Sequence, residues 1–317
     1  MVLVHTNYHS LGDPNQNEIL SSPGTALWRI IAEHICIPGV NIFVLISGWF
    51  GIKPSAKGIC SLLFQVLFFG ILLMGVGFLA GLNVPMLDSL KVLFFGAYYW
   101  FIPAYIGLFA LSPMLNSFIE NGDPKKIRGI LYSFFAIQFI YGWITNSGSY
   151  LAGYSLISFI GLYLLARYLH QYSNKLVALS PFVCLLIFLL ATLLPALYSF
   201  FAIRNDWPEF SLLFYTSPFV IIAAVSLLLL FTQLKIQSSI INWIAISVFP
   251  VYLFHLHPVI SPFFKSLCMQ LADNLSSFSY SLTAIFLAII MLLACVLVDK
   301  IRLLCWKLLY NGMQKCM

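Results

Sequence analysis

Apolar runs of about 20 residues, each long enough to cross the core of a bilayer as a helix, recur from one end of the chain to the other. Because lipid offers no hydrogen-bond partners, the backbone of each run must satisfy its N–H and C=O groups internally, as a helix does. The pattern therefore predicts nine membrane-spanning helices. They lie near residues 30–50, 59–81, 92–118, 128–145, 151–169, 178–202, 211–233, 241–263 and 281–298.

The composition supports a membrane protein. Of the 317 residues, 61% are hydrophobic and 8% are charged, whereas a soluble domain carries about 25% charged residues. The net charge is +6, but the basic residues stand singly in the polar breaks and form no patch typical of nucleic-acid binding. We expect a lipid bilayer, and no nucleic acid, as a partner. The seven cysteines lack the spacing of metal ligands, and no metal site is predicted.

The distribution of lysine and arginine sets the orientation, because cytoplasmic loops carry the excess. When alternate loops are assigned to the two sides, twelve basic residues fall on one side and four on the other. This predicts a cytoplasmic C-terminus and places residues 7–28 outside. Residues 1–6 are then expected to be the end of an outward-running first helix. The expected fold is all-α, a polytopic transmembrane helical bundle of nine full spans plus a truncated first helix, forming one N-terminally incomplete domain over residues 1–317.

Three histidines stand out, because ionisable groups at membrane depth are costly and mark functional sites by default. His5 ends the remnant of the first helix, and an imidazole that titrates near neutral pH can act as a general base. The alternative for His5 is an ordinary interfacial histidine. His255 and His257 interrupt the run 241–263 and face different sides of a helix, so at most one of them is expected to face a central cavity.

Other polar candidates lie in or beside the spans. Asn41 and Ser47 fall in the segment 39–50, where they need hydrogen-bond partners and where glycines allow close helix approach. Packing is the alternative role for both. Lys53 follows at the predicted cytoplasmic end, where it either holds the phosphates of a soluble donor or anchors the helix. Tyr105 lies in a Pro-containing, partly polar helix that suits the wall of a cavity.

In their order along the chain, these segments resemble the bacterial acyltransferase 3 family, whose multi-span membrane enzymes move acyl groups from acyl-CoA onto sugars and other hydroxyl acceptors. The resemblance covers nearly the whole chain. It rests on residues 2–5, 39–50, 100–108, 112–116, 154–168 and 252–255.

The resemblance implies one helix more than the nine full runs, with the N-terminus inside, which agrees with the topology from charge. It also implies that His5 is the catalytic histidine and that His255 is a pocket residue. The family pattern includes an arginine upstream of that histidine, and this chain begins four residues before His5. An inactive, truncated remnant is therefore one alternative.

The resulting hypothesis is a membrane O-acyltransferase, foremost an O-acetyltransferase, of the bacterial inner (cytoplasmic) membrane that modifies a cell-envelope polysaccharide. His5 would deprotonate a saccharide hydroxyl that attacks acyl-CoA, with acetyl-CoA the expected co-substrate and no bound cofactor. Lys53 would help to hold the donor. The pocket, acceptor or oxyanion candidates are Asn41, Ser47, Tyr105 and His255. A transporter or flippase of an envelope intermediate is the second alternative, although the halves of the chain show no repeat of the kind many transporters carry.

Overall fold

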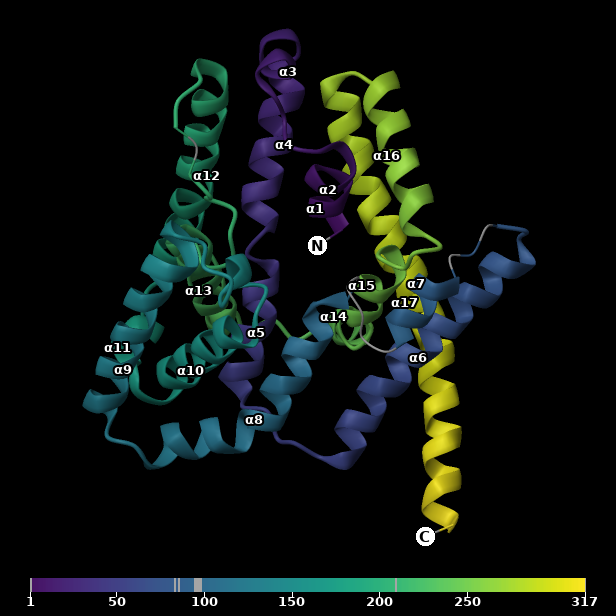
Figure 1. The fold of residues 1–317 in the computed structure, drawn as a ribbon. Coiled ribbons are helices and arrows are strands. Elements are labelled where there is room, and N and C mark those ends of the chain that lie inside the picture. Colours follow the sequence, from purple (N-terminus) through teal and green to yellow (C-terminus); the bar gives the residue numbers. More distant parts are fainter. Residues whose placement is uncertain (1, 83, 85, 94–98, 209, 317) are drawn as a thin grey trace. The chain divides into compact units, whose positions relative to one another are not determined.

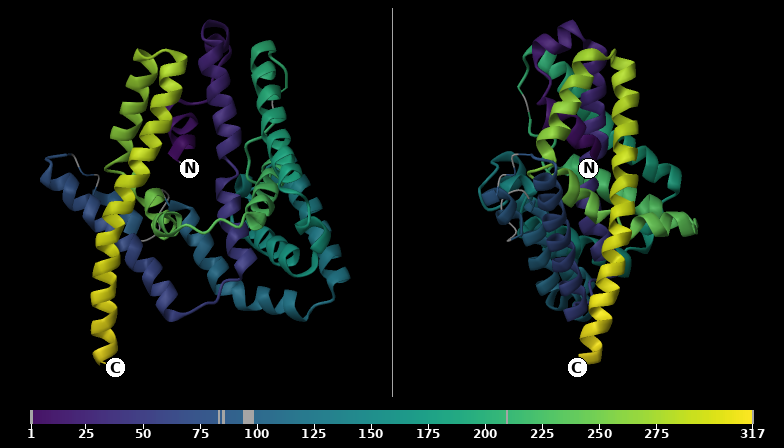
Figure 2. Two further views of the ribbon diagram at one scale, coloured as in Figure 1. Left: turned by 180° about the vertical axis from the view of Figure 1, so that it is seen from behind. Right: turned by 90° about the vertical axis from the view of Figure 1, so that its right-hand side faces the viewer.

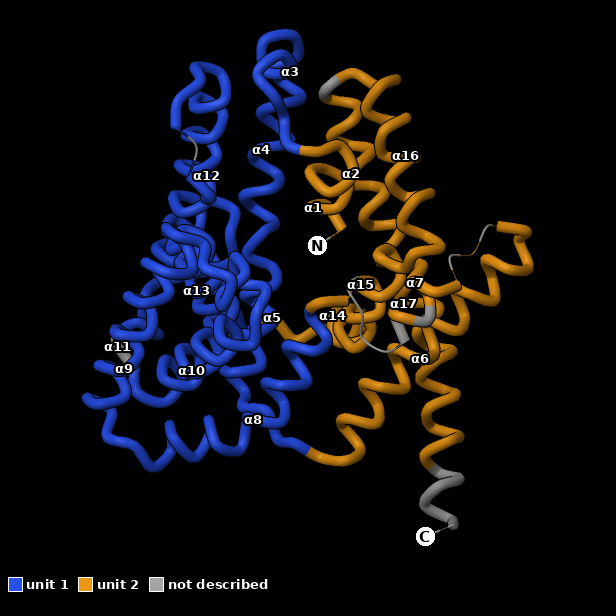
Figure 3. Tube along the Cα trace, viewed as in Figure 1, with its two compact units in different colours: residues 1, 13–54, 101–235 blue, residues 2–12, 55–100, 236–317 orange. Residues whose placement is uncertain are grey.

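The computed structural model describes the chain apart from residues 1, 83, 85, 94–98, 209 and 317. Throughout the described residues the regular structure is helical and contains no strand, so the all-α prediction is confirmed (Figure 1). The helices form two compact units (Figure 3). Unit 1 comprises residues 13–54 and 101–235, and unit 2 comprises residues 2–12, 55–100 and 236–317. Whether residues 1–317 act as one domain stays a prediction.

Unit 1 is built mainly from long apolar helices. Its helices are α3 (Gln16–Ser21), α4 (Pro23–Cys36), α5 (Gly39–Phe50), α8 (Phe101–Asn121), α9 (Pro124–Ile137), the π-helix η2 (Gln138–Ile144), the short 3-10 helix η3 (Leu151–Gly153), α10 (Leu156–Tyr172), α11 (Asn174–Val177), α12 (Pro181–Asn205) and α13 (Pro218–Gln233). Polar side chains start several of them. The side-chain oxygens of Asp123, Ser155 and Ser180 accept backbone N–H groups in the first turns of α9, α10 and α12, as N-cap residues do.

Within unit 1, α5 packs closely on α10, and α12 packs on α13 and α4. Gly48 allows the first of these contacts, because a Cβ atom added there would lie 2.5 Å from the carbonyl oxygen of Tyr163. The sequence prediction that glycines in the segment 39–50 permit close helix approach is therefore confirmed at Gly48. Fully buried side chains fill the interfaces of the unit, among them Ile30, Val44, Leu45, Leu108, Phe159, Tyr163 and Ala223.

Unit 2 combines two short N-terminal helices with the C-terminal part of the chain. Its helices are α1 (Val2–Thr6), α2 (Tyr8–Leu11), α6 (Ala56–Leu79), α7 (Met86–Leu93), α14 (Ser239–Ala245), α15 (Phe249–His255), α16 (Ser261–Asn274) and α17 (Ser277–Cys316). The short helix α2 contacts α16, and α1 contacts α15, α16 and α17 (Figures 1 and 2). Buried apolar residues from four elements join them: Val2, Val251, Phe264, Cys268 and Cys295.

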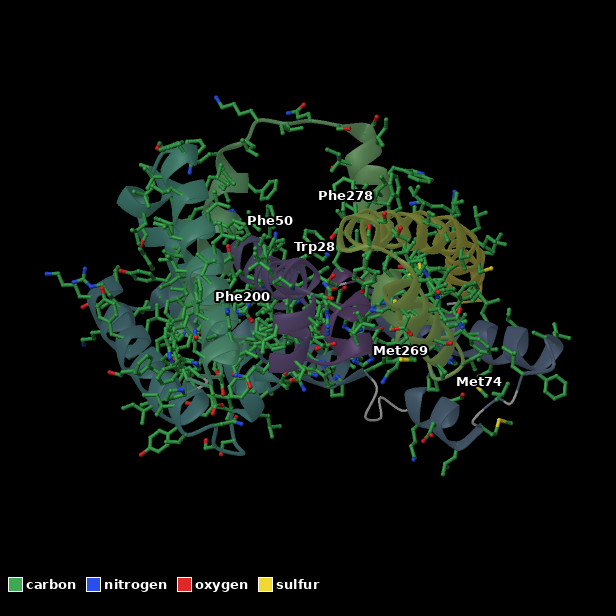
Figure 4. All side chains as sticks on the ribbon, turned by 90° about the horizontal axis from the view of Figure 1, so that it is seen from above. Trp28, Phe50, Met74, Phe200, Met269 and Phe278 are labelled. Carbon is green, nitrogen blue, oxygen red and sulfur yellow. The ribbon has the colours of Figure 1, made fainter. Side chains whose placement is uncertain are left out.

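Six helical stretches of the described residues are long and apolar enough to cross a membrane. They are Pro23–Phe50, Ala56–Leu79, Phe101–Asn121, Pro124–Ile144, Pro181–Asn205 and Phe278–Tyr310. Large apolar side chains lie on the outside, as expected for contact with lipid. Phe50 and Phe278, marked in Figure 4, are 76% and 72% exposed. A membrane protein with several spans is therefore supported.

The nine predicted spans are not confirmed. The runs 151–169 and 211–233 correspond to α10 and α13, which have 17 and 16 residues. The run 241–263 is interrupted, because α14 ends at Ala245 and α15 covers only Phe249–His255. Residues 94–98 of the run 92–118 lie outside the described residues.

Candidate functional site

Three histidines meet in unit 2, and we call them the histidine group: His5 at the end of α1, His9 in α2 and His255 at the end of α15. The ring of His5 contacts the ring of His255 edge to face, with centroids 4.6 Å apart and an interplanar angle of 78°. The ring of His5 also contacts the ring of His9, and the centroids of these two rings are 4.7 Å apart. The structure thus brings together His5 and His255, two candidates that the sequence separates by most of its length.

Hydrogen bonds to backbone carbonyls hold the helix ends that carry the histidine group. The hydroxyl of Tyr280 in α17 donates to the carbonyl of Thr6 at 2.9 Å, next to His5. The hydroxyl of Ser10 donates to the carbonyl of His5. In α15, the carbonyl of Leu253 accepts the hydroxyl of Tyr99. The chain around each ring is therefore tied to neighbouring elements of the same unit.

The side chain of His255 has a defined tautomer. Its Nδ1 lies against the carbonyl oxygen of Val251, one turn earlier in α15. Because a carbonyl oxygen only accepts hydrogen bonds, Nδ1 must carry the hydrogen, and the Nε2 of the neutral ring is then an acceptor. His255 is 1% exposed, and its Nε2 is buried without a hydrogen-bond partner. This atom is an acceptor with nothing bound to it.

His5 differs from His255 in its access to the surface. Its side chain is half-buried, while its Nδ1 is buried and has no hydrogen-bond partner. His9 is exposed. Partial burial and then the positive charge of Lys265 lower the pKa of His9. The neutral imidazole is thereby favoured at His9. At the half-buried His5, an imidazole nitrogen with a free lone pair can accept a proton from a hydroxyl.

Asn7 is a candidate that the sequence reasoning missed. It lies between α1 and α2 and is 0% exposed, yet both polar atoms of its carboxamide are buried without a partner. In the sequence it reads as one of several polar residues after the apolar stub. Its position two residues after His5 was the available signal, but its burial depends on packing that no local pattern reveals.

His257 is buried like His255 but takes no part in the histidine group. Its Nδ1 accepts the backbone N–H of Val259 at 3.3 Å, and its Nε2 is buried without a partner. In the described part of the chain, no group of three or more His, Cys, Asp or Glu residues is arranged to hold a metal ion.

Three of the other candidates lie inside unit 1. The carboxamide of Asn41 donates to the carbonyl of Tyr215 at 2.9 Å, and its oxygen is buried without a partner. Ser47 donates to the carbonyl of Phe43, and its hydroxyl oxygen lies 3.2 Å from that of Tyr105. The structure therefore brings Ser47 and Tyr105 together.

Lys53 is exposed in the segment that follows α5. Next to it, a closed set of hydrogen bonds fixes Ile52: its N–H donates to the hydroxyl of Tyr163 at 2.9 Å, and its carbonyl accepts from Asn116 at 3.0 Å. The hydroxyl of Tyr163 in turn donates to the side-chain oxygen of Asn116 at 2.7 Å. The backbone before Lys53 is held firmly, and its ammonium group is free to reach outward.

A family model described as an acyltransferase domain matches residues 1–300. The match begins before α1 and ends within α17, so it includes the histidine group and every candidate residue of unit 1. No curated protein and no solved structure matched the chain in the same comparisons.

Proposed function

Since the chain belongs to the acyltransferase 3 family, whose model matches residues 1–300, we propose that it is an O-acyltransferase that moves an acyl group from acyl-CoA to a hydroxyl of a cell-envelope saccharide. Membership in the family makes the chain an acyltransferase, and its apolar helices make it a membrane protein. The observation that carries the proposal is the histidine group, because it supplies a half-buried imidazole at His5 with two further imidazoles in contact.

In the proposed reaction, His5 is the general base. Its ring accepts the proton of the acceptor hydroxyl while the hydroxyl oxygen attacks the thioester carbonyl carbon. The carbon–sulfur bond then breaks, and the departing thiolate takes the proton back from His5, which leaves an ester and a free thiol. A thioester has a good leaving group, so orientation and stabilisation of the developing oxyanion are the remaining tasks of the protein.

Other side chains have proposed roles in binding. Asn41, Ser47 and Tyr105 are the proposed hydrogen-bond donors to the oxyanion or the acceptor, and His255 is a proposed pocket residue. Lys53 would hold phosphates of the donor, and its exposure on a firmly held backbone supports this role. Acetyl-CoA is the proposed donor, with no resident cofactor.

The proposed setting is the bacterial inner membrane. Nine full spans, a cytoplasmic C-terminus and a single acyltransferase domain over residues 1–317 remain the proposed organisation. The excess of lysine and arginine on one side of the predicted loops supports this orientation. It would place Lys53 on the side where acyl-CoA is present.

The test compares wild-type protein with His5→Ala in membrane vesicles supplied with radiolabelled acetyl-CoA and envelope glycan. We expect transfer to fall about 10²–10⁴-fold, the usual contribution of a general base. His170→Ala is the matched control, because His170 is exposed in α10 and its ring contacts only an indole among the contacts described, that of Trp49. This control should retain full transfer.

Other outcomes separate the alternatives. Full transfer by His5→Ala would contradict the proposed base. Blocked glycan export with intact acylation in His5→Ala would favour the transporter, and an absence of transfer by well-expressed wild-type protein would favour the inactive alternative.

A further inference from the structure

Two nitrogen atoms in the histidine group are buried and unpaired on rings that touch each other. They are Nδ1 of His5 and Nε2 of His255. A buried polar atom without a partner destabilises the folded chain, and here two such atoms lie in rings whose centroids are 4.6 Å apart. Because the two rings touch and neither nitrogen has another partner, a hydrogen bond between them would satisfy both atoms.

The ring of His255 is prepared to accept such a bond and cannot readily donate one. Its Nδ1 hydrogen is occupied by the carbonyl of Val251, which leaves the lone pair of Nε2 as its open hydrogen-bonding position. The hydrogen bond from Tyr99 to the carbonyl of Leu253 fixes the same turn of α15. The ring of Phe264 packs against the ring of His255 at 6.1 Å and limits its rotation.

We propose that His255 is a positioning residue for His5. In the reacting state its Nε2 accepts the Nδ1 hydrogen of His5 and thereby holds His5 in the tautomer whose Nε2 carries the free lone pair. That lone pair is the one that removes the proton from the acceptor hydroxyl. The hydrogen bond made by one ring nitrogen of a histidine decides whether the other nitrogen carries a hydrogen. His255 therefore determines which nitrogen of His5 is the base.

This inference rests on the proposed function of His5 and explains why one tautomer of its ring is present. An acceptor behind the base is the arrangement of the serine hydrolase triad, where a carboxylate orients the histidine. Here the acceptor is a neutral ring, so it orients His5 without adding a negative charge to the apolar cluster formed by Val2, Val251 and Phe264. The other imidazole in contact with His5, that of His9, is exposed.

The experiment uses the full-length protein in membranes and measures kcat and KM for acetyl-CoA. His255→Phe removes the acceptor but keeps a planar ring among apolar neighbours, and we expect kcat to fall about 10–100-fold, as it does when a metal-bound histidine loses its outer hydrogen-bond partner. KM should not change, because His255 does not bind the donor in this role. His255→Gln keeps a side-chain acceptor and should recover part of kcat.

Two results would overturn the inference. The first is a kcat of His255→Phe at the wild-type level while His5→Ala is inactive, which would leave the proposed function standing. The second is an equal loss in His255→Phe and His255→Gln, because the acceptor would then not matter. If His5→Ala retains full activity, the proposed function itself fails. Should His255→Phe not fold, as judged by its elution in detergent, the comparison of His255→Gln with His255→Ala decides between an acceptor role and none.

The combined variant His5→Ala/His255→Phe provides a further check. Residues that act as a unit are not additive, so this variant should be no less active than His5→Ala alone. A further loss in the combined variant would show that His255 acts independently of His5 and would contradict the positioning role.

Discussion

Gly48→Ala tests the closest helix contact of unit 1. Gly48 lies in α5, against α10, and its Cα faces the backbone of Tyr163 and the side chain of Ala166. A Cβ atom at this position would lie 2.5 Å from the carbonyl oxygen of Tyr163, 3.0 Å from its Cα and 2.9 Å from the Cβ of Ala166. None of these atoms belongs to the end of a flexible side chain, so the contact can be relieved only if α5 and α10 move apart.

The expected effect is a net loss of stability. Forcing an extra methyl group into a well-packed interface costs about 1–3 kcal/mol, and the rigid backbone at Gly48 favours the upper part of that range. Replacing glycine by alanine inside a helix gains about 0.5–1 kcal/mol. The free energy of unfolding should therefore fall by about 1–2 kcal/mol once the loss from overpacking is set against the helix gain.

The measurement is thermal unfolding of the purified protein in detergent. Gly129→Ala is the matched control, because Gly129 lies inside α9 of the same unit and an added Cβ there meets nothing within 4 Å. The midpoint of unfolding should fall for Gly48→Ala and stay the same or rise for Gly129→Ala. An unchanged or higher midpoint for Gly48→Ala would refute the close packing of α5 on α10.

Two further substitutions probe buried polar contacts by the same measurement. Asp299→Ala leaves the guanidinium of Arg302 buried without the carboxylate that now lies 2.6 Å away, and we expect a loss of about 3–5 kcal/mol; an unchanged midpoint would show that this ion pair is not buried in the membrane-embedded protein. Tyr163→Phe removes the hydroxyl that joins Asn116 to the N–H of Ile52 and should cost about 1–3 kcal/mol. An unchanged midpoint of unfolding for Tyr163→Phe would contradict the hydrogen bonds that fix Ile52.

The spans show what a hydropathy pattern can and cannot predict. Long uninterrupted runs such as 59–81 and 178–202 became single helices, Ala56–Leu79 and Pro181–Asn205. The run 241–263 did not, because α14 ends at Ala245 and a new helix, α15, begins beside Pro250, a position in the first turn that proline favours. Proline alone does not predict such a break, because α12 contains Pro195 in its interior. Apolar character alone counts such a segment as one span. The helical state was therefore predictable, whereas the number of long helices depended on where turns divide the runs.

The candidate site was predictable in its members but not in its contacts. The resemblance to a family selected His5, and the rarity of ionisable residues in apolar runs selected His255. Their ring contact requires that α1 pack on α15, and the five residues of α1 carry too short a pattern to predict a packing partner. For Asn7 the missing information was burial itself, because an asparagine beside a helix end is normally exposed.

The buried, unpaired atoms of the histidine group and of Asn7 share an energetic cost. Each lowers the stability of unit 2, because an apolar residue of similar shape would remove the cost of burying a polar atom without a partner. In a helical bundle with this much apolar surface, such residues would be readily accommodated. Unit 2 instead keeps polar side chains at His5, Asn7 and His255. Their presence is explained if the unpaired atoms form hydrogen bonds in the reacting state. His5 and His255 would then pair with each other, and Asn7 would pair with a bound polar group.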